Sequence, residues 1–141
     1  VDPRPIVLRA LLEEIATATL PPGTVYELDV PGDLAVLADR LVLDRVVSNL
    51  LTNAVRYGVP PIVVAAERRD RYLRISVGDQ GAGVPDDLRP RLFERFARGT
   101  TAAGSGLGLS IARSYARAHG GDLVYQHDRD GPRFELIVPQ A

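Results

Sequence analysis

The sequence predicts an α/β fold, a two-layer sandwich in which helices cover one face of a mixed, largely antiparallel sheet. Three observations lead to this prediction. Several short stretches alternate apolar and polar residues, as half-buried strands do. These stretches follow one another in pairs, which is more typical of antiparallel strands than strict strand–helix–strand alternation is. Three longer segments instead carry apolar residues at helical spacing.

The chain begins with a predicted helix and two predicted strands. Residues 5–20 have apolar side chains at helical spacing, with Pro5 near the start, where a helix tolerates proline. Residues 24–30 alternate like a strand and stop at the Pro31-Gly32 pair. Residues 34–39 form a second short strand candidate.

The middle of the chain contains the longest predicted helix and a pair of strands. The helix covers residues 39–57 and ends at Gly58, which is followed by the Pro60-Pro61 pair. Residues 62–67 and 72–77 are predicted strands joined by a charged turn.

The last part of the chain begins with a polar, glycine-containing stretch. An amphipathic helix is then predicted over residues 107–121, where it is closed by glycines. Two strands, 122–128 and 133–139, follow around the turn "RDGP". We expect residues 1–141 to form a single domain.

Composition and charge limit the classes of function. A net charge of -1 gives no bulk attraction to nucleic acid or to an anionic membrane, so we expect no nucleic-acid partner. No apolar stretch is long enough to cross a bilayer, and no signal peptide is visible. The chain has no cysteine, which excludes disulfides and thiolate metal sites and suits a cytosolic domain. It starts at Val1 rather than Met, so we expect it to be part of a longer protein.

Two amides lie at the edge of the apolar stripe of the longest helix. Asn49 and Asn53 are four residues apart and therefore stack on one side. Arg56 and Tyr57 continue the same edge. Mg²⁺ takes oxygen ligands and often uses few protein ligands together with phosphate oxygens, so a neutral amide suits a metal already bound by a polyphosphate. Taken alone, the pair also fits amides that only satisfy nearby backbone or solvent.

A glycine-containing turn follows the strand 72–77 directly. Gly81 and Gly83 remove side chains where the chain turns, which lets a ligand approach the backbone. Asp79 lies at the strand end, where its carboxylate can accept a hydrogen bond from an amino group. A Rossmann phosphate loop would lead into a helix, whereas Pro85 and a polar stretch follow here. An ordinary turn is the alternative interpretation.

Three glycines lead straight into the last helix. Gly104, Gly106 and Gly108 leave backbone N–H groups free at the positive end of the helix dipole, which favours an anion site. Ser105 adds a hydroxyl donor. The alternative is a flexible hinge.

The segment 84–105 is predicted to be a mobile lid. Phe93 and Phe96 are three residues apart and can pin a one-turn helix against the core. The rest of the segment has little apolar material to fix it. Arg95 and Arg98 are candidates to contact phosphates, and the alternative is that both are solvated at the surface.

Together, in this order and spacing, the motifs are specific. The stretches "NLLTNAVRYG", "DQGAGVP", "LFERFARG" and "GSGLGLSIA" resemble the N, G1, F and G2 boxes of the catalytic domain of bacterial sensor histidine kinases. That domain belongs to the gyrase, Hsp90, histidine kinase and MutL superfamily. The resemblance runs from about residue 5 to the end of the chain. It implies the Bergerat α/β sandwich, with ATP held under a mobile lid.

The resemblance implies a role for each matched position. Asn53 resembles the Mg²⁺ ligand of the family, with Asn49 as its helper one turn earlier. Asp79 resembles the carboxylate that receives the adenine amino group, and Gly81 and Gly83 match the glycines beneath the base.

Further matched positions are implied to contact the nucleotide. Arg56 stands where the family usually has Lys, so a planar fork replaces a point charge, and it joins Asn49 and Asn53 as an implied catalytic residue. Tyr57 matches the usual aromatic residue beside the nucleotide. The other implied nucleotide-binding residues are Val84, Arg98, Gly104, Ser105, Gly106, Leu107 and Gly108. Two departures are Gln80 in place of the usual Asn and Ser105 in place of the usual Thr.

Position 49 distinguishes the branches of the superfamily. Hydrolysing members resemble one another in having Glu there, whereas Asn49 has no basic carboxylate with which to activate water. This favours transfer of the γ-phosphoryl group to a histidine in a separate dimerisation domain, which we expect to end just before Val1. Neither His119 nor His127 has the sequence context of a phosphoacceptor. The alternatives are an ATPase-type conformational clamp and a regulatory module that binds nucleotide without transfer.

The resemblance also implies cofactors, partners and a location. ATP and Mg²⁺ are the implied cofactors. The implied partners are the dimerisation and phosphoacceptor domain of the same kinase and, through the full-length kinase, a response regulator. We expect the isolated domain to be monomeric, the full-length kinase to be a homodimer anchored in the bacterial inner membrane, and this domain to lie in the cytoplasm.

Overall fold

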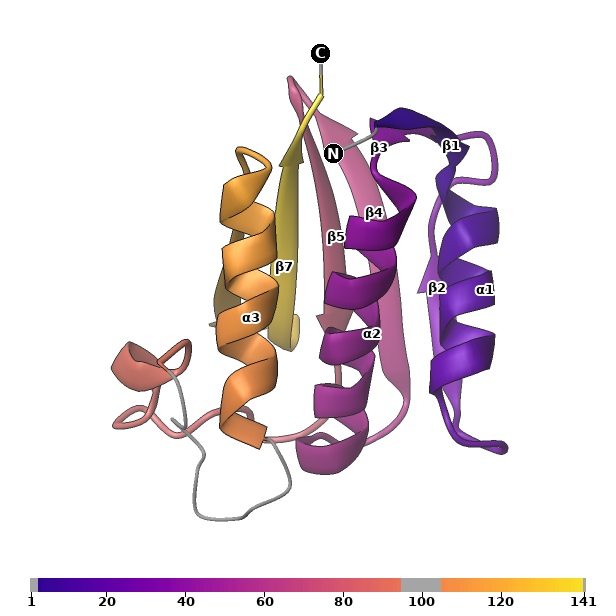
Figure 1. Cartoon of the computed structure of the whole chain (residues 1–141). Helices are drawn as coiled ribbons and strands as arrows, with labels where there is room; N and C mark the ends of the chain where they lie inside the picture. Colours follow the sequence, from indigo (N-terminus) through magenta and orange to yellow (C-terminus); the bar gives the residue numbers. More distant parts are fainter. Residues whose placement is uncertain (1–2, 95–104, 141) are drawn as a thin grey trace.

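Helices cover one face of the sheet, as the sequence predicts (Figure 1). The computed structural model describes residues 3–94 and 105–140, and for residues 105–107 it describes the backbone alone. Within this part of the chain the helices are α1 (Leu8–Thr19), α2 (Arg40–Tyr57), the short 3₁₀ helix η1 (Arg89–Arg91) and α3 (Ser105–Ala118). None of these helices is long and apolar enough to cross a membrane.

The main sheet has five strands in the order β2-β4-β5-β7-β6. Its strands are β2 (Tyr26–Asp29), β4 (Ile62–Arg69), β5 (Tyr72–Gly78), β6 (Asp122–Asp128) and β7 (Gly131–Pro139). Strand β2 pairs with β4 in parallel, and the other pairs are antiparallel. The sheet is therefore mixed and largely antiparallel, which confirms the predicted fold class.

The predicted start of the first helix was wrong. Residues Arg4–Val7 form a strand, β1, and the helix begins only at Leu8. Strand β1 pairs antiparallel with β3 (Ala35–Ala38) in a separate two-stranded ribbon. Pro5 has no N–H to donate and fits an edge strand, and the β-branched side chains after it also favour a strand. A partner distant in sequence thus outweighs the local helical spacing.

Helix α2 joins the core to one wall of the site. It begins after Asp39, whose carboxylate accepts hydrogen bonds from the backbone N–H groups of Leu41 and Val42. Its apolar stripe is buried in the core and consists of Leu43, Val46, Val47, Leu50, Leu51 and Ala54. Because this stripe fixes the rotation of the helix, it also fixes the direction in which the neighbouring amides point.

The C-terminal end of the chain is attached to the ribbon through Gln140. The Gln140 side chain is 6% exposed. Its amide oxygen accepts from the backbone N–H of Leu37 at 2.9 Å, and its amide nitrogen donates to the Leu37 carbonyl oxygen at 2.9 Å. One side chain therefore takes the place of a neighbouring strand along β3.

Candidate functional site

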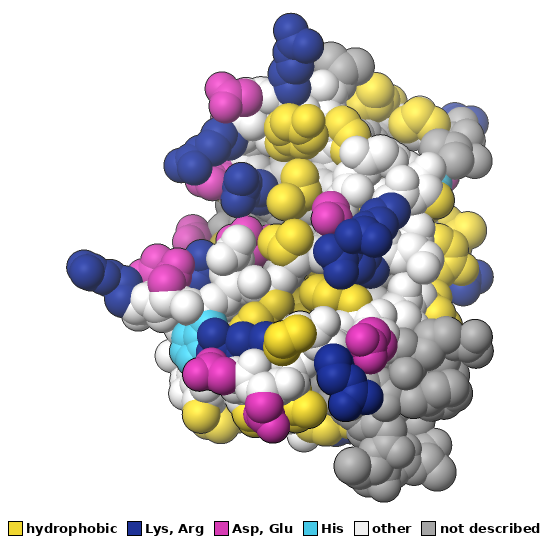
Figure 2. Space-filling model, turned by 90° about the vertical axis from the view of Figure 1, so that its left-hand side faces the viewer, with side chains coloured by type: hydrophobic (Ala, Val, Ile, Leu, Met, Phe, Trp, Pro, Cys, Tyr) yellow, Lys and Arg dark blue, Asp and Glu magenta, His cyan; other side chains and the backbone are white. Residues whose placement is uncertain are grey.

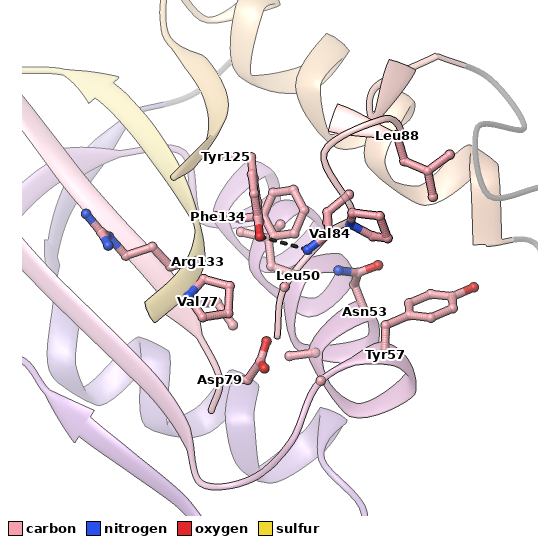
Figure 3. Close-up of a pocket in the computed structure, with 15 residues that line it drawn as sticks. Leu50, Asn53, Tyr57, Val77, Asp79, Val84, Leu88, Tyr125, Arg133 and Phe134 are labelled. Atoms are coloured by element: carbon pink, nitrogen blue, oxygen red, sulfur yellow. Dashed lines mark hydrogen bonds between the residues drawn. The ribbon is translucent and has the colours of Figure 1, made fainter. Parts of the chain in front are cut away.

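A cavity of about 380 Å³ opens between the C-terminal end of α2 and the strands β5, β6 and β7 (Figure 3). Its size lies in the range of small-molecule sites. The wall is mainly apolar, with a few polar groups that face one another across it. Its lining comprises Leu50, Asn53, Ala54, Tyr57, Gly58, Val77, Asp79, Gly83, Val84, Pro85, Leu88, Tyr125, Pro132, Arg133 and Phe134.

Asp79 is the polar group that the fold holds most firmly. It follows the last residue of β5 and points into the cavity in Figure 3. Its Oδ1 accepts hydrogen bonds from the backbone N–H groups of Gly81 at 2.7 Å and Val59 at 3.2 Å. Among the residues that the structure describes, no donor reaches Oδ2. One oxygen is therefore fixed by the protein, and the other can accept from a donor group of a ligand.

Gly58 allows this carboxylate to approach the end of α2. A Cβ atom at Gly58 would lie 2.5 Å from Asp79 Cγ, 2.6 Å from Asp79 Oδ2 and 2.7 Å from the carbonyl oxygen of Ala54. The backbone N–H of Gln80 donates to the Val59 carbonyl oxygen at 2.8 Å and ties the same two loops together. The sequence predicts Gly58 only as a helix end, because the approach of Asp79 is a tertiary contact.

Replacing Gly58 with alanine should therefore destabilise the domain. The added methyl group has no space between Asp79 and Ala54, and overpacking of this kind costs about 1–3 kcal/mol. The matched control is Gly32→Ala, since a Cβ at Gly32 meets nothing within 4 Å. The free energy of unfolding in urea measures both variants. Equal losses in the two variants would contradict the proposed close approach.

The two amides of α2 occupy different places. Asn53 lines the cavity, and its contact with a metal or ligand stays a prediction. Asn49 is absent from the lining. Its Oδ1 lies 3.6 Å from the position that a Cβ on Gly108 would take, so it lies at the contact between α2 and the first turns of α3. A ligand that extends from Asn53 towards the start of α3 would pass Asn49.

The other predicted residues fall into three groups. Tyr57, Gly83 and Val84 line the cavity, and Gly81 lies beside the Asp79 carboxylate. Arg56 is exposed and lies outside the described lining. Arg98 and Gly104, like Phe96 and the rest of residues 95–104 of the predicted lid, lie outside the described residues, and so do the side chains of Ser105 and Leu107. Their assignments stay predictions.

Aromatic residues on β6 and β7 form a wall that was not predicted from the sequence. The rings of Tyr125 and Phe134 have their centroids 5.1 Å apart, and the Tyr125 hydroxyl accepts from the backbone N–H of Val84 at 2.9 Å. A signal was present, because side chains two residues apart in a strand point to the same face. Leu123 is fully buried, so Tyr125 points to the same side near the end of β6.

Arg133 lines the cavity, but its guanidinium points away from it (Figure 3). It binds Asp128 at 2.9 Å and Glu135 at 3.0 Å. The hydrogen bonds from Arg133 are the main cause that lowers the pKa of the Asp128 carboxyl to about 2. The same pairing raises the pKa of Arg133. The Arg133 guanidinium is therefore paired with carboxylates outside the cavity. The Asp79 carboxylate, in contrast, points into the cavity.

Residues 38–141 match the family of histidine kinase-, DNA gyrase B- and HSP90-like ATPases. The chain is 36% identical over 119 residues to the signal transduction histidine-protein kinase AfsQ2 of Streptomyces coelicolor, a match that covers 81% of this chain and 22% of that protein. It is 34% identical over 116 residues to the histidine-protein kinase BaeS of Escherichia coli, covering 77% of this chain and 25% of that protein. The chain thus spans about a quarter of the length of these relatives.

Two solved structures are similar over nearly their whole length. The catalytic domain of histidine kinase ThkA, in a nucleotide-free form, superposes with a TM-score of 0.85 at 26% identity, covering 99% of this chain and 97% of that one. The ATP-binding domain of PrrB from Mycobacterium tuberculosis superposes with a TM-score of 0.78 at 27% identity, covering 100% of this chain and 99% of that one.

Proposed function

We infer the function from the family to which the chain belongs, the histidine kinase-, DNA gyrase B- and HSP90-like ATPases. We propose that it is the ATP-binding catalytic domain of a two-component sensor histidine kinase. In this proposal the domain binds Mg-ATP and transfers the γ-phosphoryl group to a histidine of a separate dimerisation domain. The observation that carries the proposal is the Asp79 carboxylate, which lines a mainly apolar cavity and has Oδ1 held by two backbone N–H groups.

The cavity suits an adenine base. The amino group of adenine donates to Asp79 Oδ2, a charge-assisted hydrogen bond inside a largely apolar pocket. Val77, Val84 and Phe134 cover the faces of the base, while Tyr57 lies at the more exposed side of the cavity. One edge of the base thus makes a specific hydrogen bond, and apolar side chains shield its two faces from water.

The same geometry provides a path for the phosphates. From Asp79 the ligand follows α2 past Asn53 and Asn49 to the beginning of α3, where a helix N-terminus favours anions. The neutral amide oxygen of Asn53 is suited to be a ligand of Mg²⁺, because the phosphates already balance the charge of the ion. When bound, Mg²⁺ neutralises charge on the β- and γ-phosphate oxygens. Arg56 lies one turn beyond Asn53, on the exposed side.

The reaction needs a nucleophile from another domain. Transfer requires an in-line acceptor close to the γ-phosphate, and the amide of Asn49 has no basicity with which to activate water. His119 Nδ1 lies 2.8 Å from the Tyr115 carbonyl oxygen at the end of α3, and His127 lies 2.8 Å from an Arg89 nitrogen. Both histidines therefore have structural contacts of their own.

Incubation with γ-labelled ATP tests this function. The domain alone should bind Mg-ATP in calorimetry, hydrolyse it slowly at most and leave itself unlabelled. Addition of the dimerisation domain of the same kinase should give acid-labile, base-stable phosphate on that partner. Robust turnover by the domain alone would instead support an ATPase-type clamp. Tight binding with no transfer would support a regulatory module. No heat of binding at millimolar nucleotide would refute the proposed kinase function and both alternatives.

We extend the proposal to the whole kinase. Residues 1–141 form one domain, the full-length kinase is a homodimer in the inner membrane, and the domain works in the cytoplasm. The phosphoryl group then passes to a response regulator. The relatives named above are histidine-protein kinases, which supports this extension.

A further inference from the structure

We infer that Arg89, Tyr125 and His127 form a clamp on Val84 that sets the width of the base end of the cavity. The three are positioning residues, because they act on a bound base through the backbone of Val84. The inference rests on the proposed function and goes beyond it, since it assigns these residues an effect on base affinity. The clamp involves η1 and β6, elements at the side of the molecule that faces the viewer in Figure 2, where basic, acidic and histidine side chains gather beside hydrophobic ones.

The Val84 backbone is held from both sides. Its N–H donates to the Tyr125 hydroxyl at 2.9 Å, and its carbonyl oxygen accepts from Arg89 Nε at 3.1 Å. The Val84 side chain is 6% exposed and lines the cavity. A shift of this backbone therefore moves the wall that covers the base.

The preceding residue brings the clamp into direct contact with the turn. Gly83 has a φ of +80°, which favours glycine. A Cβ at this position would collide with the Tyr125 hydroxyl and would lie 2.9 Å from His127 Nδ1. The side chains of β6 thus pack against the bare backbone of the turn that carries Val84.

His127 orients Arg89. The guanidinium lies over the Tyr125 ring at 5.5 Å, and its Nη2 atom is 2.8 Å from His127 Nδ1. A guanidinium has donors only, so this contact requires Nδ1 to be the acceptor. Asp86 Oδ1 lies 3.4 Å from Arg89 Nη1. The clamp therefore depends on an acceptor at position 127.

Loss of the acceptor at position 127 should loosen the clamp. Arg89 Nη2 would then lose its contact with Nδ1, and the guanidinium would be held less firmly over the Tyr125 ring. The other charged groups near the imidazole are Asp86 beside Arg89, Asp128 on β6, and Arg133 of β7, which is paired with Asp128. Base affinity should therefore decrease when the side chain at position 127 cannot accept a hydrogen bond.

Adenosine is the probe of choice, because it carries the base without phosphates and needs no metal. Tyr125→Phe and Arg89→Lys should each weaken adenosine binding by about 3- to 10-fold, the effect of one lost hydrogen bond. The matched controls are Tyr72→Phe, at an exposed site on β5, and Arg91→Lys, which is in the same 3₁₀ helix and pairs with Glu94 at 3.2 Å. The controls should stay within a factor of about two.

Two replacements of His127 separate positioning from plain structural support. His127→Asn keeps an acceptor oxygen where Nδ1 lies, so its adenosine affinity should stay within a factor of about two of that of the unaltered domain. His127→Leu removes the acceptor and should weaken adenosine binding by about 3- to 10-fold.

The clamp would be overturned if the variants lowered only the free energy of unfolding. It would also be overturned if His127→Asn and His127→Leu bound adenosine equally well. Failure of the unaltered domain to bind either adenosine or Mg-ATP would overturn the proposed function and the clamp with it. Normal binding of both ligands with unaffected variants would overturn the clamp alone.

Discussion

Replacing Asp79 with alanine should weaken the binding of ATP and of ADP to the same degree. Both nucleotides carry the base whose amino group is proposed to donate to Asp79 Oδ2. The loss should be about 1.5–3 kcal/mol, the scale of a hydrogen bond to a charged group in a largely apolar site. Calorimetric titration of the two nucleotides against the variant measures it.

Asp79 also supports its own turn, so a second variant is needed. Asp79→Asn retains an oxygen that can accept from the N–H groups of Gly81 and Val59, but it places an NH₂ group against the amino group of the base. It should keep the turn and still lose affinity. The control is Asp87→Ala, an exposed carboxylate in the neighbouring loop. ADP affinity that is unchanged in both Asp79 variants would refute the assignment.

Replacing Asn53 with alanine should remove most of the Mg²⁺ dependence of ATP binding and abolish phosphoryl transfer. The side chain is proposed to act through the metal on the γ-phosphate, so labelling of the partner histidine should fall by about 100-fold or more, the scale seen when a group that stabilises developing charge is lost. Adenosine binding should stay near normal, because the base lies against Asp79 and the apolar walls.

The adjacent Thr52→Ala variant is the control, because Thr52 is exposed on the same helix and lies outside the cavity lining. It should retain both Mg²⁺ dependence and transfer. If adenosine binding collapsed as far as ATP binding in Asn53→Ala, the amide would be a structural residue of α2 and the metal assignment would be wrong.

The parts of the site that come from continuous segments were predictable. Helical spacing alone places Asn53 and Tyr57 beside the stripe that contains Leu50, so all three reach one cavity. Asp79 follows a strand directly, and the loop after a strand is a common position for a ligand-facing side chain. The resemblance of the four motifs then supplied a role for each residue, which the spacing did not.

The parts that depend on pairing between distant segments were not predictable. Tyr125 reaches Val84 only because β6 pairs with β7 beside β5, and no local pattern specifies that order. Gly58 is required by a contact with a residue 21 positions later in the chain. Helix α1 was predicted correctly from the spacing of Leu8, Leu11, Leu12 and Ile15. The residues before Leu8 pair with β3 instead of extending the helix.

The attachment of Gln140 to Leu37 has a consequence for the order in which the domain is completed during synthesis. The two residues are 103 positions apart, so the ribbon stays without this contact until Gln140 has been made. Strand β7 is translated after β6, although it lies between β5 and β6 in the sheet. A nascent chain that ends before β7 has α1, α2 and the Asp79 turn but lacks one wall of the cavity. The site is therefore completed only after both sides of the sheet have been synthesised, since chains are made from the N-terminus onward.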